Sequence, residues 1–79
     1  MRYNYSKLRG KIREMFGSER NFAVALEISH ASMSAKLCNK VGFTQDEIMK
    51  AQSLLNININ SVPEYFFCHD DLDFRNYLF

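Results

Sequence analysis

Two cysteines and two histidines are the side chains best suited to hold a metal or to act as nucleophiles, namely Cys38, Cys68, His30 and His69. Zinc sites and redox motifs use pairs of such residues separated by about two to five positions, and these four residues form no such pairs. We interpret both cysteines as free thiols in a reducing compartment. The sequence therefore predicts no metal site.

Catalytic patterns are also missing from the sequence. It contains no Ser–His–acid arrangement and no glycine-rich loop that could cradle a phosphate. The adjacent acids Asp70 and Asp71 are better explained as solvated charge than as a general acid–base pair. We expect a protein that is not an enzyme and that takes no cofactor or small-molecule ligand.

The segment ERNFAVALEISHASMSAKL, residues 19–37, predicts two short helices joined by a tight turn. The first runs over about residues 19–26 and buries Phe22, Ala23 and Leu26. The small side chain of Ala23 would let another backbone approach closely.

The second helix of this pair begins after Ser29, which is a good N-cap. Met33 and Leu37 face inward, and Ile28 packs on Met33 as a hydrophobic staple. The outward positions are Ala31, Ser32, Ser34 and Ala35. A helix with a small, uncharged outer face, held by a second helix across a short turn, can enter the major groove of DNA. The alternative is an ordinary helical hairpin of a small bundle.

Three further helices complete the expected all-α fold. A first helix is expected over about residues 4–16, with one apolar face made by Leu8, Ile12, Met15 and Phe16. Gly17 suits its end and Ser18 the start of the next helix.

A fourth helix opens at Thr44, where Glu47 completes a capping box, and ends at Asn56 in the left-handed conformation. Its buried stripe is Ile48, Ala51, Leu54 and Leu55. A second capping box, Ser61 with Glu64, opens a short fifth helix.

The helix pair resembles the helix–turn–helix of phage repressors of the lambda and Cro type. Ala23 fills the small position of that motif, whereas Glu27 stands where the turn usually has glycine. The similarity extends through NYSKLRGKIREMFGS before the pair and through KLCNKVGFTQDEIMKAQSLLNI and PEYFF after it, over residues 3–67. These segments resemble small Cro-like repressors of phages and mobile elements in Gram-positive bacteria. The resemblance implies a five-helix lambda-repressor-like DNA-binding domain over residues 1–67, followed by a tail, residues 68–79, of uncertain structure.

The same resemblance suggests which residues meet DNA. The outer positions of the second helix of the pair are expected to contact base edges, namely His30, Ala31, Ser34 and Ala35. Phosphate contacts fall to Arg20, Lys36, Asn39, Lys40, Thr44 and Gln45, the last two through backbone N–H groups. His30 has a plainer alternative as a solvated histidine at a helix end.

The charge is uneven along the chain. Residues 1–42 hold eight Lys/Arg and three Asp/Glu, a net of +5, whereas residues 43–79 hold two and six, a net of −4. A basic half that contains the candidate reading helix favours a polyanionic partner. Charged helices can also give such an imbalance by chance.

The aromatic residues concentrate near the end of the chain. This apolar surface is either folded back on the core or shared with a second chain, and we favour the second chain. The expected homodimer interface is Tyr65, Phe66, Phe67, Leu72, Phe74, Tyr77, Leu78 and Phe79.

With 79 residues, the chain is expected to form one small domain, without a signal peptide or a membrane span, in the bacterial cytoplasm near the nucleoid. Two function classes remain. The favoured one is a sequence-specific, double-stranded DNA-binding repressor that occupies an operator as a dimer. The alternative is a protein-binding regulator of the antirepressor or antitoxin type that uses the same fold.

Overall fold

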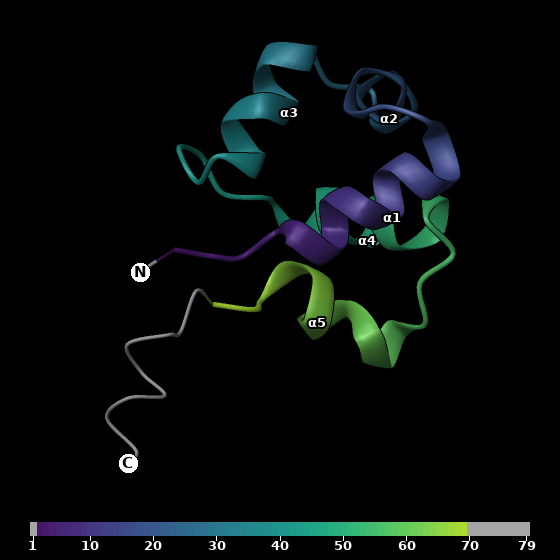
Figure 1. The fold of residues 1–79 in the computed structure, drawn as a ribbon, viewed down its shortest axis with the longest axis vertical. Helices are drawn as coiled ribbons and strands as arrows, with labels where there is room; N and C mark the ends of the chain where they lie inside the picture. The colour runs from purple at the N-terminus through teal and green to yellow at the C-terminus, as the bar shows by residue number, and fades with distance from the viewer. Residues whose placement is uncertain (1, 70–79) are drawn as a thin grey trace.

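A computed structural model describes residues 2–69, which form five α-helices and one 3₁₀ turn (Figure 1). The elements are α1 Ser6–Phe16, α2 Glu19–Leu26, α3 His30–Leu37, α4 Gln45–Leu54, η1 Ile59–Ser61 and α5 Val62–Phe66. Helix α2 packs on α1, α3 and α4, and α5 packs on α1. The predicted all-α, five-helix fold is confirmed over these residues. None of the helices in residues 2–69 has the length and apolar character needed to cross a membrane.

Serine and threonine caps set the start of three helices, as the sequence predicts. Ser18 accepts a hydrogen bond from the Asn21 N–H, and Thr44 forms a complete capping box with Glu47. The prediction of a capping box at the start of α5 is wrong. The Ser61 side chain makes no cap hydrogen bond, and the chain enters α5 through η1 instead. Helix α1 starts at residue 6, two residues later than predicted.

Three non-glycine residues have left-handed backbones, and two of them end a helix at a predicted position. Glu27, at the end of α2, has φ 66°, and Asn56, after α4, has φ 54°. The third, Asn39, has φ 67° and follows α3. At Glu27 the turn closes through hydrogen bonds from the Glu27 N–H to the Val24 carbonyl (3.0 Å) and from the Ile28 N–H to the Ala23 carbonyl (3.0 Å). The turn therefore keeps the geometry that usually calls for glycine.

The core draws on every helix. Its buried members are Tyr5, Leu8, Ile12, Phe22, Ala23, Leu26, Met33, Leu37, Ala51, Leu55, Ile57, Val62 and Phe66. The predicted inward positions of α2 and α3 are confirmed. The prediction that Met15 lies on the inward apolar face of α1 is wrong, because Met15 is 43% exposed.

The N-terminal arm and the end of α5 are fastened together, which the sequence does not indicate. The Asn4 N–H donates to the Cys68 carbonyl (2.6 Å), and Tyr3 pairs with His69 in an antiparallel bridge with stacked rings. The Asn39 side chain accepts from the Tyr3 N–H (2.8 Å) and donates to the Tyr3 carbonyl (2.9 Å). We call this arrangement of Tyr3, Asn4, Asn39, Cys68 and His69 the clasp. It holds both ends of the described chain beside the loop that follows α3 (Figure 1).

Candidate functional site

Helix α3 is held rigidly by contacts at both ends. The Ser29 hydroxyl accepts from the Ser32 N–H (3.0 Å) at the start of the helix, and Met33 is fully buried beneath it. At its end the Arg9 guanidinium donates to the Leu37 carbonyl (3.3 Å). These contacts fix which side of α3 meets solvent.

The predicted base-reading residues share the outer side of α3. His30, Ala31 and Ser34 are exposed, and Ala35 is half-buried. We define the α3 surface as His30, Ala31, Ser32, Ser34, Ala35 and Val41. Apart from the imidazole of His30, this surface carries no ionisable side chain.

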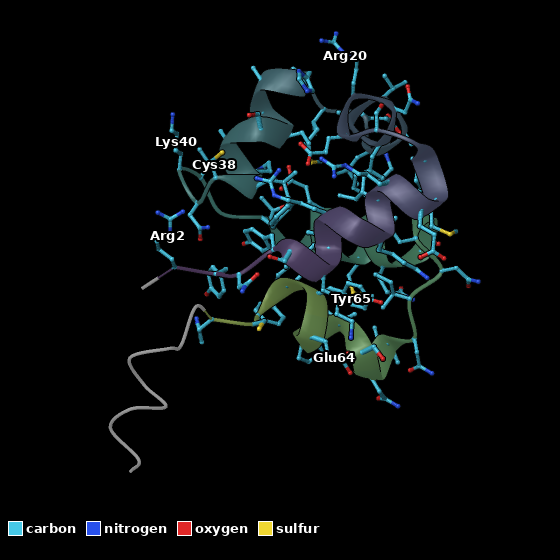
Figure 2. The ribbon with its side chains drawn as sticks, viewed as in Figure 1. Arg2, Arg20, Cys38, Lys40, Glu64 and Tyr65 are labelled. Carbon is cyan, nitrogen blue, oxygen red and sulfur yellow. The ribbon has the colours of Figure 1, made fainter. Side chains whose placement is uncertain are left out.

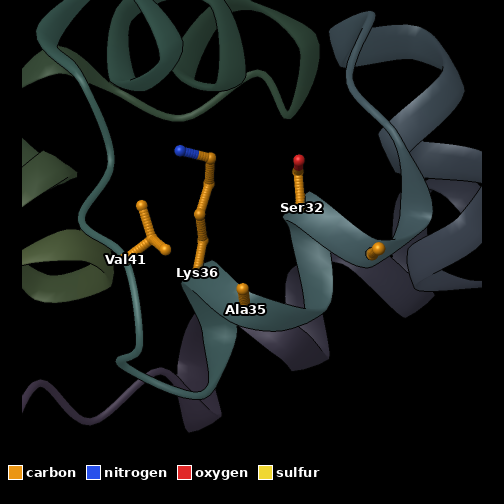
Figure 3. Close-up of a pocket in the computed structure, with 5 residues that line it drawn as sticks. Ser32, Ala35, Lys36 and Val41 are labelled. Atoms are coloured by element: carbon orange, nitrogen blue, oxygen red, sulfur yellow. The ribbon is translucent and has the colours of Figure 1, made fainter.

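A shallow hollow of about 230 Å³ lies in the α3 surface (Figure 3). It is lined by Ala31, Ser32, Ala35, Val41 and the side chain of Lys36. Val41 is 52% exposed and belongs to the loop after α3. Sequence reasoning missed Val41 because an aliphatic residue in a loop gives no periodic signal.

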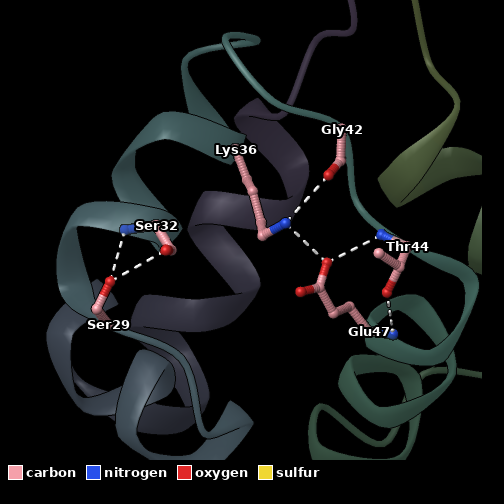
Figure 4. Close-up of polar contacts among 6 residues, drawn as sticks. All are labelled: Ser29, Ser32, Lys36, Gly42, Thr44 and Glu47. Carbon is pink, nitrogen blue, oxygen red and sulfur yellow. Dashed lines mark hydrogen bonds and ion pairs between the residues drawn. The ribbon is translucent and has the colours of Figure 1, made fainter.

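Lys36 does not offer its charge to a ligand. It is only 7% exposed, and its ammonium group donates to the Gly42 carbonyl (3.0 Å) and pairs with the Glu47 carboxylate (2.8 Å) (Figure 4). The predicted contact of Lys36 with phosphate would have to break these two contacts, and it stays a prediction. Its aliphatic stem forms part of the hollow, and its charge is neutralised inside the protein.

Glu47 is the centre of this polar network (Figure 4). It accepts from the Thr44 N–H (2.9 Å) as well as from Lys36. Burial raises the pKa of Glu47, but the hydrogen bonds from Lys36 and Thr44 outweigh it, so the pKa lies below the ordinary value. The ionised pair joins α3 to the start of α4.

Two more residues predicted to contact phosphate, Asn39 and Thr44, also have hydrogen-bond partners within the protein, and their contacts with phosphate stay predictions. The Asn39 amide is used in the clasp, and the Thr44 N–H is taken by Glu47. Gln45 is exposed at the first position of α4, and its contact with phosphate stays a prediction.

Arg20 and Lys40 keep the exposure that a phosphate contact needs. Both are exposed, and Figure 2 shows their side chains projecting away from the body of the molecule, as does that of Arg2. Within residues 2–69 none of the three forms an ion pair. Glu19, at the start of α2, is paired with Arg9 (2.7 Å). The centre of the α3 surface is thus neutral and partly apolar.

A protein-family model described as "Protein of unknown function (DUF739)" matches residues 1–69. This chain belongs to that family. The solution structure of the modulator of repression (MOR) of the temperate bacteriophage TP901-1 from Lactococcus lactis is similar to this chain with 46% sequence identity and a TM-score of 0.75. The match covers 85% of this chain and 90% of that one. No protein with a curated description matches.

The DUF739 match ends at His69, and it takes in all five helices and the clasp. Among the residues predicted for a dimer interface, Phe66 is 2% exposed and belongs to the core, so it offers almost no surface to a second chain. Tyr65 is half-buried with the Lys7 ammonium 5.1 Å above its ring, whereas Phe67 is 47% exposed. The remaining dimer residues, Leu72, Phe74, Tyr77, Leu78 and Phe79, lie outside the described residues.

Proposed function

We propose that this DUF739 protein modulates repression in a temperate phage or phage-derived element, and that it does so by binding another regulatory protein through the α3 surface. The observation that carries the proposal is the hollow between α3 and Val41. Its lining is small and aliphatic, and the one cation in it, Lys36, is neutralised by Glu47.

An apolar side chain of a protein partner fits such a hollow better than a nucleic acid does. DNA offers apolar contact mainly through thymine methyl groups, and it rewards cations at the protein surface. Of the six residues expected to contact phosphate, Lys36, Asn39 and Thr44 already have polar partners within the protein. A protein interface favours this arrangement of an apolar centre and a polar rim.

The partner that we propose is the repressor encoded in the same element. The similar phage protein is described as a modulator of repression. A protein that modulates repression can do so by binding the repressor and changing its activity. Arg20 and Lys40 are exposed, and such cations suit acidic groups on a partner.

Operator binding of the Cro type is the second candidate function. It is favoured by the capped helix α3, by its outer residues His30 and Ser34, and by the cations Arg20 and Lys40. In this case two subunits would place their α3 helices in successive major grooves of a palindromic site.

An NMR titration distinguishes the two candidates. The isotope-labelled chain is titrated with the element's own repressor and, separately, with duplex DNA from upstream of its gene at the same salt concentration. We expect the repressor to shift the amide signals of Ala31, Ala35 and Val41 and the DNA to leave them nearly unchanged. Shifts of these signals by DNA alone would favour the second candidate and overturn the first.

A further inference from the structure

The clasp brings together two cations that are far apart in the sequence. Arg2 precedes Tyr3, and Lys40 follows Asn39. The Asn39 amide accepts from the Tyr3 N–H (2.8 Å) and donates to the Tyr3 carbonyl (2.9 Å), so the two segments lie close together. Arg2 and Lys40 are each one residue away from this pair of hydrogen bonds. Both side chains are exposed and project away from the body of the molecule (Figure 2).

Lys40 also lies beside the hollow in the α3 surface. Its N–H donates to the carbonyl of Ala35 (2.9 Å), and it precedes Val41 in the chain. Ala35 and Val41 both line the hollow. The backbone of Lys40 is therefore fixed at the wall of the hollow, and the clasp holds the backbone of Arg2 near that of Lys40.

No acid within residues 2–69 neutralises these two cations. Most acids in this range are paired with other cations, and only Glu14 on α1 and Asp46 on α4 form no ion pair there. Two like charges held close together repel each other, and a negatively charged group bound between them relieves that repulsion. The pair Arg2 and Lys40 is therefore suited to an anionic group of a partner.

We propose that Arg2 and Lys40 bind acidic side chains of the protein partner whose apolar side chain enters the hollow. A cavity of about 150 Å³ can hold benzene, so a hollow of about 230 Å³ has room for one leucine, methionine or phenylalanine side chain. The partner thus presents one apolar side chain with one or two carboxylates beside it. Arg2 can bind a carboxylate through two parallel hydrogen bonds, whereas Lys40 acts as a point charge.

This inference rests on the proposed function, because it names the chemistry of the partner for the same α3 surface. The apolar hollow beside the cations favours a protein over DNA, which offers phosphates but no large apolar side chain. The segment before α1 thereby becomes part of the binding surface. Asn39 is a positioning residue, since it holds that segment beside Lys40.

Association kinetics with the repressor of the same element test the role of Arg2. Arg13→Gln is the matched control for Arg2→Gln, because it removes an exposed arginine of α1 that forms no ion pair within residues 2–69 and leaves the same net charge. We expect Arg2→Gln to lower the association rate constant about fivefold at low ionic strength, with a smaller difference in high salt. Arg13→Gln should lower it less than about twofold. Equal rate constants for the two variants overturn the inference.

The outcomes separate this inference from the proposed function. If the repressor shifts the amide signals of Ala31, Ala35 and Val41 while the two variants associate equally, only the inference fails. A natural chain that does not bind the repressor overturns both. If Arg2→Gln weakens binding to upstream DNA but not to the repressor, the cations are assigned to phosphate and the inference is overturned.

Asn39→Gly tests whether the clasp positions Arg2. Glycine accepts the left-handed backbone at residue 39, so both cations remain while the two hydrogen bonds with Tyr3 are lost. We expect the affinity for the repressor to fall about threefold, whereas Asn56→Gly, with the same backbone class outside the clasp, keeps the natural affinity. Adding Arg2→Gln to Asn39→Gly should then cost less affinity than Arg2→Gln alone. Additive losses would contradict the positioning role of Asn39.

Discussion

The role of a charged residue in this protein depends on which neighbours its side chain can reach. Lys36 has the residue type and the position on α3 that suit a phosphate contact, and the sequence alone supports that interpretation. Its stem instead runs toward α4, where Glu47 and the Gly42 carbonyl bind the ammonium group. Sequence spacing could not reveal this contact, because it depends on how α3 packs against the start of α4.

Lys36→Ala should lower the free energy of unfolding by about 2 kcal/mol. The loss is smaller than for a fully dry ion pair, because Glu47 keeps part of its surface in water. Urea denaturation measures it. The double variant Lys36→Met with Glu47→Gln should be more stable than Lys36→Ala, since it leaves no unpaired carboxylate, and the reverse order would contradict this view of the network.

Glu47 should also make the protein sensitive to acid. Its pKa in the folded state lies below the ordinary value of 4.5, so the unfolded chain binds the proton more readily. The stability from this group is present above about pH 4.5 and is lost as the pH falls through the folded pKa. We expect the fall in unfolding free energy between pH 7 and pH 3 to be smaller in Glu47→Gln than in the natural protein, as urea titrations at both pH values would show. An equal fall would mean that Glu47 does not contribute.

Glu27→Gly should raise the thermal unfolding midpoint by up to about 5 °C. Its left-handed backbone, with φ 66°, is one that glycine adopts without strain. The greater freedom of glycine in the unfolded chain offsets part of this gain. Glu27→Ala serves as the control, because it loses the contact with Lys50 but keeps the strained backbone. A lower midpoint for Glu27→Gly than for Glu27→Ala would show that the backbone strain is negligible.

At the scale of elements, cap residues and apolar periodicity in the sequence predicted the helices well. Ser18, Ser29 and Thr44 cap α2, α3 and α4 because each offers an oxygen to an N–H group in the first turn. The clasp could not be predicted in this way. It joins Tyr3 to Asn39, which lies 36 positions away, and then to His69. Contacts at such separations have no periodic signature.

Asn39→Gly should lower the unfolding free energy by about 1 kcal/mol. Glycine accepts the left-handed backbone at this position, so the change isolates the two hydrogen bonds with Tyr3. Amide hydrogen exchange should also speed up at Tyr3 and Asn4. Asn56→Gly is the matched control, because Asn56 has the same backbone class outside the clasp. Similar exchange at Tyr3 in both variants would show that the clasp is not stabilising.

At the scale of the whole molecule, residues 1–42 present less positive charge to the outside than their count of lysines and arginines implies. Lys7, Arg9 and Lys36 are paired with acids, so they contribute less to an external field. The sequence placed the outer residues of α3 correctly on one exposed side. It could not show the hollow, which needs the loop residue Val41 beside the helix.

The pairing of these cations bears on the salt dependence expected if the protein binds DNA. A dimer that uses only Arg20 and Lys40 of each subunit neutralises four phosphates, so the log–log slope of affinity against salt should be no steeper than about −4. Fluorescence anisotropy with duplex DNA measures that slope. A slope of about −5 to −7 would require three or four phosphate contacts per subunit, and would show that further residues bind phosphate.

The most direct test of the α3 surface as a protein-binding site is the affinity of Ala35→Lys for the repressor of the same element, measured by calorimetry beside Ser53→Lys. Ala35 lines the hollow, whereas Ser53 is exposed on α4. A lysine at residue 35 places a cation in the apolar hollow, which should disfavour an apolar side chain of a protein partner. The same cation would not repel the phosphates of DNA. We predict that Ala35→Lys lowers the affinity for the repressor at least about tenfold, while Ser53→Lys does not. Unchanged affinity for the repressor, together with stronger binding of Ala35→Lys to upstream DNA, would contradict the protein-binding account.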